Sequence, residues 1–425
     1  MVAPGDDSLR RDVVWNLVPV ALLAIVGLGL NFVIGGWWGP AALGVFNLVT
    51  MAVFSLAIVG AGGLQYAVLR AVAEDASGTH DRDHVAAVVV GALVPNLVLA
   101  ALATVIFVAI RHPVGRLLGS DAVAEGMLWA APGVFCFAIN KVLFGVVNGL
   151  RRMRAFAIYT SLRYLLIAAG LVLARVEQVA GDQLAVIWTF TEGTLLLVLL
   201  GELLATVKLW RGRGWLAHAR AHLDYGARGV LATLALEVNS KLDVWMLGVA
   251  LPETQVGIYA LASALYEGVL QLAVVLQNNF NPLLARHLAH DRRAEVATLA
   301  RSSRRWFVPA AVAVCALSAL VYPFAIPWLI GNPAFIAGAI PFAILMAGVA
   351  LASPYLPFTQ LLLMASRPGW HTLYVLGTVG IAFLADLLLV PAFAEIGVAI
   401  GTALGTVASA VLLRVLARWR LGVRI

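Results

Sequence analysis

Long apolar runs, each about as long as a bilayer is thick, are the main feature of this chain. A helix needs roughly 20 apolar residues to cross the hydrocarbon region, and twelve segments meet this requirement. Glycine and proline pairs, such as Gly39-Pro40 and Pro368-Gly369, separate several runs and favour turns. The predicted spans are residues 13–34, 41–69, 85–110, 123–147, 156–173, 184–209, 230–250, 256–284, 307–330, 335–365, 373–390 and 397–416. The pattern predicts an all-α integral membrane protein of about twelve transmembrane helices.

Composition agrees with a lipid environment. The chain has 425 residues, 62% of them hydrophobic and 12% charged, whereas a soluble protein has roughly 45–50% apolar and about 25% charged residues. The net charge of +7 lies in short gaps between apolar runs, so it predicts no nucleic-acid partner, which would need a basic face on a soluble domain. Cys136 and Cys315 lie inside apolar runs and predict neither a disulfide nor a metal site. No cofactor is expected.

The distribution of Lys and Arg tests the count of spans, because these residues accumulate on cytoplasmic loops. Of the 29 Lys and Arg residues, 22 fall on one side of the predicted membrane, and only Arg111, Arg116 and Arg175 fall on the other. If one span had been missed or added, the basic loops after that point would fall on the opposite side of the membrane. We therefore expect a multi-pass protein of the inner or plasma membrane with both termini in the cytoplasm. The first run is too long for a signal peptide and is expected to be a retained span.

A repeated motif divides the chain into halves. Residues 44–48 (GVFNL) resemble residues 257–261 (GIYAL), 213 positions later, and residues 70–75 (RAVAED) resemble residues 286–291 (RHLAHD). Six spans per half would bring both halves into the membrane from the same side, as parallel repeats with a substrate cavity between them. We expect six-helix lobes over residues 1–209 and 225–425, joined by a cytoplasmic linker over residues 210–224.

Four short segments carry a resemblance to a known family. Residues 39–46 (GPAALGVF), 69–74 (LRAVAE), 256–262 (VGIYALA) and 395–403 (EIGVAIGTA) resemble the polysaccharide flippases, often called Wzx-like. Their superfamily also contains the MATE multidrug exporters and the MurJ-type lipid II flippases. The resemblance implies two six-helix bundles around a central cavity that opens alternately to either side. It also implies transport of a lipid-linked oligosaccharide for surface polysaccharide synthesis, with membrane lipid, glycosyltransferases and a polymerase as partners.

The first span narrows the choice within this superfamily. Many MATE exporters carry an acidic residue in the first helix, and MurJ-type flippases carry arginines there. Residues 13–34 contain no charged side chain. The absence of an acidic residue and of arginines from this span favours the polysaccharide flippases over the MATE exporters and the MurJ-type flippases.

Ionisable residues inside the spans are the candidate site. Each costs a few kcal/mol to insert and usually faces a partner or a wet cavity. Arg163 and Lys141 each lie about ten residues from a basic loop, which places them ~15 Å into the membrane. Glu237 and Lys241 are four residues apart on one helix face, where a locked ion pair is an equal alternative to a cavity role.

Roles follow from the chemistry of these groups. Arginine offers a planar fork and lysine a point charge for phosphate, so we expect Lys141, Arg163 and Lys241 to bind a pyrophosphate headgroup or its sugars. The acidic candidates for ion coupling or structural ion pairs are Glu192, Glu237, Asp243, Glu267 and Asp386.

Other functions remain open. A cation-coupled exporter of small amphiphiles would use Glu237, Asp243, Glu267 or Asp386 to exchange a proton. A facilitator-type transporter usually has a Gly-x3-Asp-x2-Gly-Arg-Arg pattern, which residues 74–84 lack. A membrane glycosyltransferase or ligase generally needs a sizeable external loop, and external connections here are short. Since no Gly-x4-Gly-Lys-Ser/Thr loop and no catalytic constellation occur, neither an ATPase nor another enzyme is expected.

Overall fold

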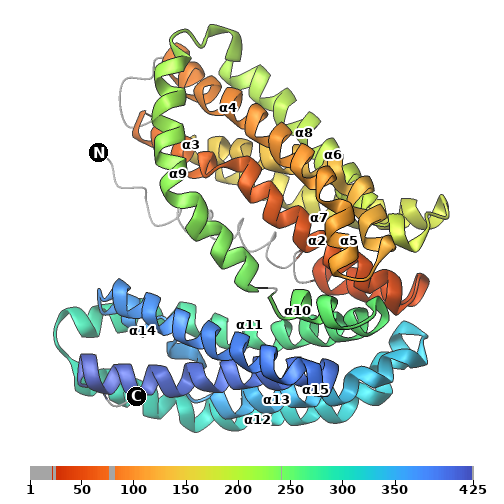
Figure 1. Ribbon diagram of the computed structural model, residues 1–425. Coiled ribbons are helices and arrows are strands. Elements are labelled where there is room, and N and C mark those ends of the chain that lie inside the picture. Colours follow the sequence, from red (N-terminus) through yellow and green to blue (C-terminus); the bar gives the residue numbers. More distant parts are fainter. Residues whose placement is uncertain (1–21, 23–24, 76–81, 241, 424–425) are drawn as a thin grey trace. The chain divides into compact units, whose positions relative to one another are not determined.

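The computed structural model of the chain contains two compact groups of helices (Figure 1). It describes residues 22, 25–75, 82–240 and 242–423. The N-terminal unit comprises residues 45–240 with the helix up to Val33, and the C-terminal unit comprises Ile34–Gly44 with residues 242–423. Nearly all described residues are helical, and no strand occurs among them. The predicted all-α fold is confirmed.

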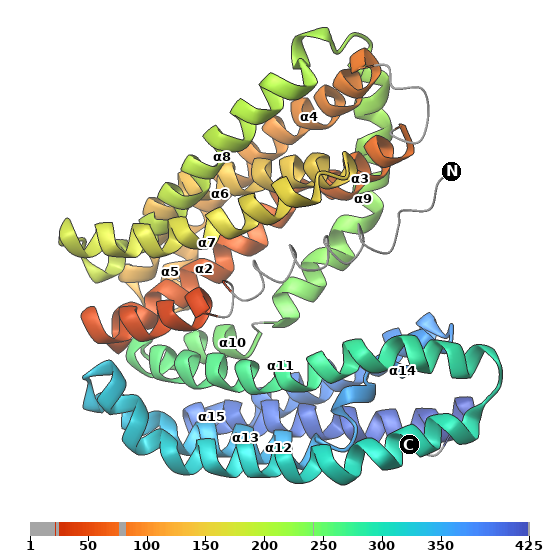
Figure 2. The ribbon, with the colours of Figure 1, turned by 180° about the vertical axis from the view of Figure 1, so that it is seen from behind.

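The N-terminal unit is organised around α6, which contacts α3, α4, α5, α7 and α8. Both ribbon views show α6 beside α4 and α8 (Figures 1 and 2). Ser120 caps the start of α6, because its Oγ accepts a hydrogen bond from the Val123 amide at 3.1 Å. The helices of this unit are Ile25–Trp37 as far as Val33, α2 (Pro40–Ala61) from Val45 on, α3 (Leu64–Asp75), α4 (Arg82–Ala109), α5 (Arg111–Leu117), α6 (Asp121–Gly149), α7 (Met153–Val176), α8 (Val186–Val207) and α9 (Trp215–Ser240). Short 3-10 turns lie at Gly181–Gln183 and Leu209–Arg211.

Polar side chains inside this unit form hydrogen bonds with backbone groups of neighbouring helices. In α4, which contains Pro95, the buried Asn96 amide donates to the Gly60 carbonyl at 3.0 Å. In α6, which contains Pro132, the Gly133 amide donates to Thr189 Oγ1 at 3.1 Å. Hydrocarbon offers no water to such groups, so they must find partners within the protein. These contacts therefore fit a lipid-embedded bundle.

In the C-terminal unit, the helix named α15 is two helices joined by a sharp reversal. Ala394 has φ 52° and ψ −132°, which is not helical. A Cβ placed on Gly401 would lie 3.1 Å from the Asp386 amide nitrogen, so the chain after the break runs back along the chain before it. The elements of this unit are α10 (Leu242–Ala250), α11 (Glu253–Ala289), α12 (Arg293–Ile330), η3 (Pro333–Gly338), α13 (Ala339–Ala352), η4 (Leu356–Phe358), α14 (Leu361–Met364), α15 (Pro368–Leu416) and a π-helical turn (Ala417–Leu421).

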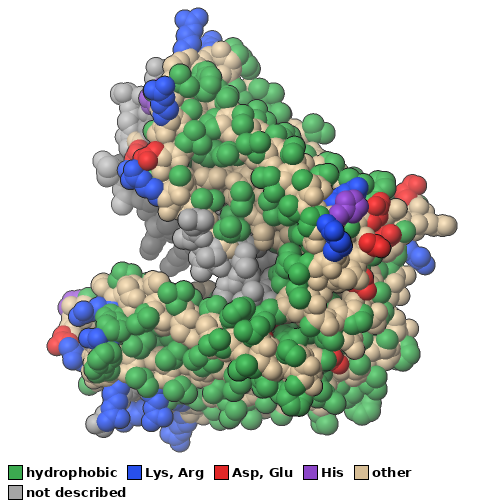
Figure 3. All heavy atoms as spheres, viewed as in Figure 1, with side chains coloured by type: hydrophobic (Ala, Val, Ile, Leu, Met, Phe, Trp, Pro, Cys, Tyr) green, Lys and Arg blue, Asp and Glu red, His purple; other side chains and the backbone are tan. Residues whose placement is uncertain are grey.

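The helices account for the predicted spans. Nine helices in the described residues are long and apolar enough to cross a membrane, with α15 counted once. When α15 is counted as two helices, and α9 and α10 together are matched to the span predicted at residues 230–250, the helices cover eleven of the predicted spans. The helix Ile25–Trp37 covers the end of the first predicted span, whose beginning lies outside the described residues. Figure 3 shows flanks covered mainly by hydrophobic side chains, with charged side chains gathered near helix ends. The chain is a multi-pass membrane protein.

Within the C-terminal unit, the start of α2 (Pro40–Gly44), where the first copy of the repeated motif begins, crosses the start of α11, where the second copy begins. A Cβ on Gly44 would lie 1.9 Å from the Glu253 carbonyl oxygen, and a Cβ on Gly257 would lie 1.9 Å from the Pro40 carbonyl oxygen. Pro40 and Gly44 precede Glu253 and Gly257 by the same 213 positions. Such a reciprocal contact is expected where two copies of one motif meet about a twofold axis, and it supports the internal repeat.

The predicted linker over residues 210–224 enters α9, which packs on α3 and α4. His222 is buried, and its Nε2 lies 3.2 Å from the Val88 carbonyl oxygen. Removal of the ring from water lowers the pKa of His222 below its ordinary value of 6.5. From Trp215 on, this stretch is therefore a helix packed within the N-terminal unit. The lobe boundaries at residues 209 and 225 stay a prediction.

Candidate functional site

A buried ion pair joins three helices of the N-terminal unit. Arg163 of α7 donates from Nη2 to Glu192 Oε2 at 3.0 Å, and its Nε lies 2.9 Å from Oε1 in an ion pair. The Glu192 side chain, on α8, is 0% exposed, and that of Arg163 is 18% exposed. Asn140 of α6 donates to Glu192 Oε2 and to the Glu192 carbonyl oxygen, both at 2.9 Å. The carboxylate is thus held by a cation and an amide, as a buried charge requires.

Aromatic rings support the cations of this cluster. The Arg163 guanidinium lies 4.8 Å from the ring centre of Phe137 and 4.9 Å from that of Phe144. Lys141 Nζ lies 5.1 Å from the Phe137 ring centre. Trp188 stacks parallel to Phe137 at 6.5 Å between centres. The negative faces of aromatic rings stabilise nearby cations, so the two basic residues lie on an apolar wall that nevertheless tolerates their charge.

The cluster of Lys141, Arg163 and Glu192 contains two basic side chains and one carboxylate. A guanidinium has five N–H donors, more than the single carboxylate of Glu192 can accept. Arginine and lysine both bind phosphate oxygens, and aromatic faces offer apolar contact for sugar rings. The arrangement can therefore hold an anionic, sugar-bearing headgroup.

The C-terminal unit contains a separate polar cluster around Asp243 of α10. Asp243 Oδ2 accepts hydrogen bonds from the Tyr259 hydroxyl at 3.2 Å and from Ser263 Oγ at 3.4 Å. The Tyr259 hydroxyl also lies 3.4 Å from Thr402 Oγ1, on the second half of α15. Two hydroxyls of α11 therefore donate to the carboxylate of α10, and α15 joins the cluster through the contact of Thr402 with Tyr259.

A second carboxylate, Asp386 on the first half of α15, belongs to the same cluster. It is 3% exposed, and its Oδ1 has no hydrogen-bond partner among the described residues. A Cβ on Gly401 would lie 1.8 Å from this oxygen, so the carboxylate occupies space that only glycine leaves open. Asp386 and Asp243 lie close enough to interact electrostatically. Two nearby carboxylates surrounded by hydroxyls suit a shared proton or a hard cation.

The other predicted site residues are distributed differently. Glu267 is half-buried on α11, next to Tyr266, whose hydroxyl lies 2.8 Å from Thr406 Oγ1. Lys241 and the side chain of Glu237 lie outside the described part of the chain, so their proposed pairing stays a prediction. In that part, no group of three or more His, Cys, Asp or Glu is arranged to hold a metal ion.

Sequence reasoning found the acids of the C-terminal unit but missed the hydroxyls that surround them. Tyr259 with Ser263, and Thr402 with Thr406, are each four positions apart, a spacing that places both groups on one helix face. That spacing was the available signal. It did not reveal that the two helices face each other.

Comparison with known proteins places the fold. Residues 9–288 match the family described as "Polysaccharide biosynthesis protein", and no curated protein matches the chain. Among solved structures, the fold is similar to an inward-facing multidrug resistance MATE family transporter of the MOP superfamily, with a TM-score of 0.71 and 16% identity over 96% of this chain and 98% of that chain.

Two further structures are similar along nearly the whole chain. The lipid II flippase MurJ in an inward closed conformation has a TM-score of 0.72 and 12% identity, over 96% of this chain and 87% of that chain. The Vibrio cholerae MATE transporter VcmN in the bent form has a TM-score of 0.55 and 13% identity, over 95% and 94%. At such identities the likeness establishes the fold alone. The family match confirms the resemblance noted in the sequence, and the likeness to these structures confirms the two-bundle, twelve-helix architecture that the resemblance implies.

Proposed function

Because the chain belongs to the polysaccharide biosynthesis protein family, we propose that it carries a lipid-linked oligosaccharide across the cytoplasmic membrane by alternating access, for synthesis of a surface polysaccharide. The substrate class is a polyprenyl diphosphate glycan, supplied by glycosyltransferases and consumed by a polymerase. Both chain termini lie in the cytoplasm. Translocation changes no covalent bond, so the protein acts as a transporter and not as an enzyme.

The observation that carries this proposal is the cationic cluster on the aromatic wall of the N-terminal unit. A diphosphate must keep its negative charge compensated while it is inside the membrane, where an unpaired charge costs several kcal/mol. Lys141 and Arg163 supply that compensation on the Phe137 ring. Glu192 compensates Arg163 when no substrate is bound. Phosphate and Glu192 then compete for the Arg163 guanidinium. Arg163 therefore has an anionic partner both with and without bound substrate.

The first prediction concerns a double variant, Lys141→Ala with Arg163→Ala, in a strain that lacks its own flippase. We expect surface polysaccharide to fall at least tenfold relative to the wild-type protein, because loss of a buried charged partner costs about 2–5 kcal/mol. Cell-surface glycan is measured by immunoblot, and protein amount is measured in the membrane fraction. Arg175→Ala, an exposed residue at the far end of α7, is the matched control and should restore wild-type levels. Full restoration by the double variant would refute the headgroup contact.

The acidic cluster of the C-terminal unit supports a coupling role. Asp243 and Asp386 are the two carboxylates of the hydroxyl-lined cluster. We propose that they bind a proton or a monovalent cation during each cycle, so that an ion gradient drives the carrier. The same pair also favours the alternative function, a cation-coupled exporter of small amphiphiles. Growth tests separate the two functions, because an exporter changes drug resistance and a flippase changes surface glycan.

A second prediction tests the coupling. Asp386→Asn keeps the shape of the side chain but removes its charge. In reconstituted vesicles, we expect the variant to lose the acceleration of transport that an imposed proton or sodium gradient gives the wild type, while the rate without a gradient changes less than twofold. Asp224→Asn, an exposed acid on α9 with its side chain 67% exposed, should respond like the wild type. An unchanged response of Asp386→Asn would remove the acidic pair from the coupling mechanism.

A further inference from the structure

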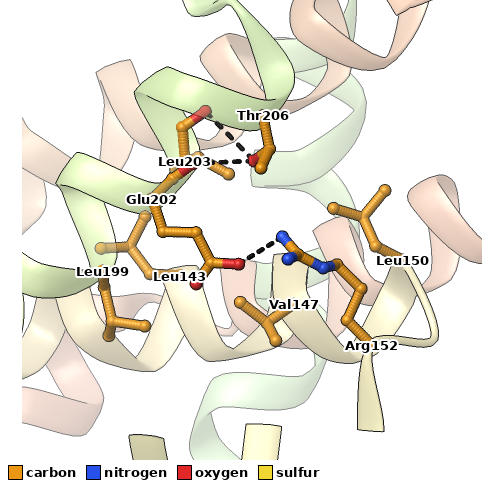
Figure 4. Close-up of a pocket in the computed structure, with 8 residues that line it drawn as sticks. All are labelled: Leu143, Val147, Leu150, Arg152, Leu199, Glu202, Leu203 and Thr206. Carbon is orange, nitrogen blue, oxygen red and sulfur yellow. Dashed lines mark hydrogen bonds and ion pairs between the residues drawn. The ribbon is translucent and has the colours of Figure 1, made fainter. Parts of the chain in front are cut away.

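A shallow groove lies between the ends of α6 and α8 in the N-terminal unit, beside the turn that leads into α7 (Figure 4). The empty space between its walls is about 250 Å³, part of it open to the surroundings. The groove can therefore hold only part of a lipid. Its walls are mainly aliphatic, from Leu143, Val147, Leu150, Leu199 and Leu203.

An ion pair lies in this apolar groove. Figure 4 shows the Glu202 side chain reaching from α8 toward Arg152, with Oε1 of Glu202 in contact with the Arg152 guanidinium. The Glu202 side chain is only 17% exposed, whereas that of Arg152 is 41% exposed. The other carboxylate oxygen, Oε2, is buried and has no hydrogen-bond partner among the described residues. The groove therefore offers a buried acceptor beside a more accessible cation.

The position of the groove suits the boundary between headgroups and acyl chains. Arg151, Arg152 and Arg154 follow the end of α6 within six residues, as basic residues do at membrane surfaces. On α8, Leu197 is 73% exposed and Leu204 is 40% exposed. Exposed leucines on a spanning helix are compatible with contact to lipid chains. The groove thus has a charged rim and an apolar floor.

We propose that this groove binds a phospholipid whose headgroup carries a primary ammonium, that is, phosphatidylethanolamine. The ammonium donates to the Glu202 carboxylate, the phosphate contacts Arg152, and the first acyl carbons lie on the leucine side chains. Charge decides between this lipid and the lipid-linked substrate. A diphosphate would bring several negative charges against a buried carboxylate, whereas a zwitterion complements both members of the ion pair. This inference does not depend on the proposed substrate.

The test is native mass spectrometry of the purified full-length protein with phosphatidylethanolamine, its N-methyl and N,N-dimethyl forms, and phosphatidylcholine, all with the same acyl chains. Each methyl group removes one N–H donor, so bound lipid should decrease along this series. We expect the wild type to bind phosphatidylethanolamine about tenfold more tightly than phosphatidylcholine, the effect of one charge-assisted hydrogen bond. In Glu202→Gln the ratio should fall below about twofold, and phosphatidylglycerol should gain affinity because Arg152 is then uncompensated.

Glu125→Gln, at the opposite end of α6, is the matched control and should keep the wild-type ratio. The melting temperature of each detergent-solubilised variant shows whether it is folded. Equal binding of phosphatidylethanolamine and phosphatidylcholine by the wild type would overturn the proposal, as would an undiminished preference in Glu202→Gln. Displacement of bound phosphatidylethanolamine by farnesyl diphosphate would assign the groove to the substrate and would also overturn it.

Discussion

Glu192→Gln is expected to destabilise the N-terminal unit by about 3 kcal/mol, because removal of one partner leaves the other charge of a buried pair uncompensated. Arg163 would retain its charge beside the rings of Phe137 and Phe144 but without its carboxylate partner. The loss corresponds to a drop of roughly 6–12 °C in the melting temperature of a unit of about 200 residues. Differential scanning fluorimetry of the purified protein in detergent measures this drop.

A double-mutant cycle shows that the effect comes from the pair. Arg163→Gln combined with Glu192→Gln should recover most of the lost stability, since no bare charge then remains. Glu74→Gln breaks an exposed Arg70–Glu74 pair, whose side chains are 59% and 63% exposed, and should leave the melting temperature almost unchanged because solvent screens such pairs.

The same variants separate a structural pair from a substrate contact. If Arg163 serves only to hold helices, the stable double variant should transport normally; if it binds the headgroup, transport should stay low despite recovered stability. A melting temperature unchanged by Glu192→Gln would contradict the burial and the pairing seen at this site.

Gly257→Ala and Gly44→Ala are expected to be strongly damaging single methyl additions. Each new Cβ would lie 1.9 Å from a carbonyl oxygen of the opposing helix, and backbone cannot move aside as a side chain can. The helices would have to separate, which costs about 3 kcal/mol or more when a packed contact is overfilled. Alanine stabilises a helix relative to glycine by only about 1 kcal/mol. The cost of the clash exceeds this gain, so each substitution is expected to destabilise the protein. We expect little folded protein in the membrane fraction by fluorescence-detected size-exclusion chromatography.

Gly268→Ala is the control, because Gly268 lies in the same helix, α11, and no atom lies within 4 Å of a Cβ placed there. It should be neutral or slightly stabilising. Normal yield and melting temperature for both Gly44→Ala and Gly257→Ala would mean that the two motifs do not cross as closely as the structure shows.

The sequence by itself determined the environment, the helical class and the approximate number of spans. The reason is that these properties depend on local quantities. A run of about 20 apolar residues predicts a membrane-spanning helix, whatever that helix packs against. Residues 44–48 and 257–261 also revealed the repeat, because duplicated segments keep similar sequences. The predicted membrane topology rests on the distribution of Lys and Arg between the two sides of the predicted membrane.

Only the tertiary structure decided which polar groups meet. Arg163 and Glu192 are 29 positions apart, and Tyr259 and Thr402 are 143 positions apart. No periodicity links residues on different helices, because their contact depends on how each helix is rotated and how far it is shifted along its axis. The same holds for Glu202 and Arg152. Their charges were visible in the sequence, but their approach in one apolar groove follows from the packing of α6 against α8.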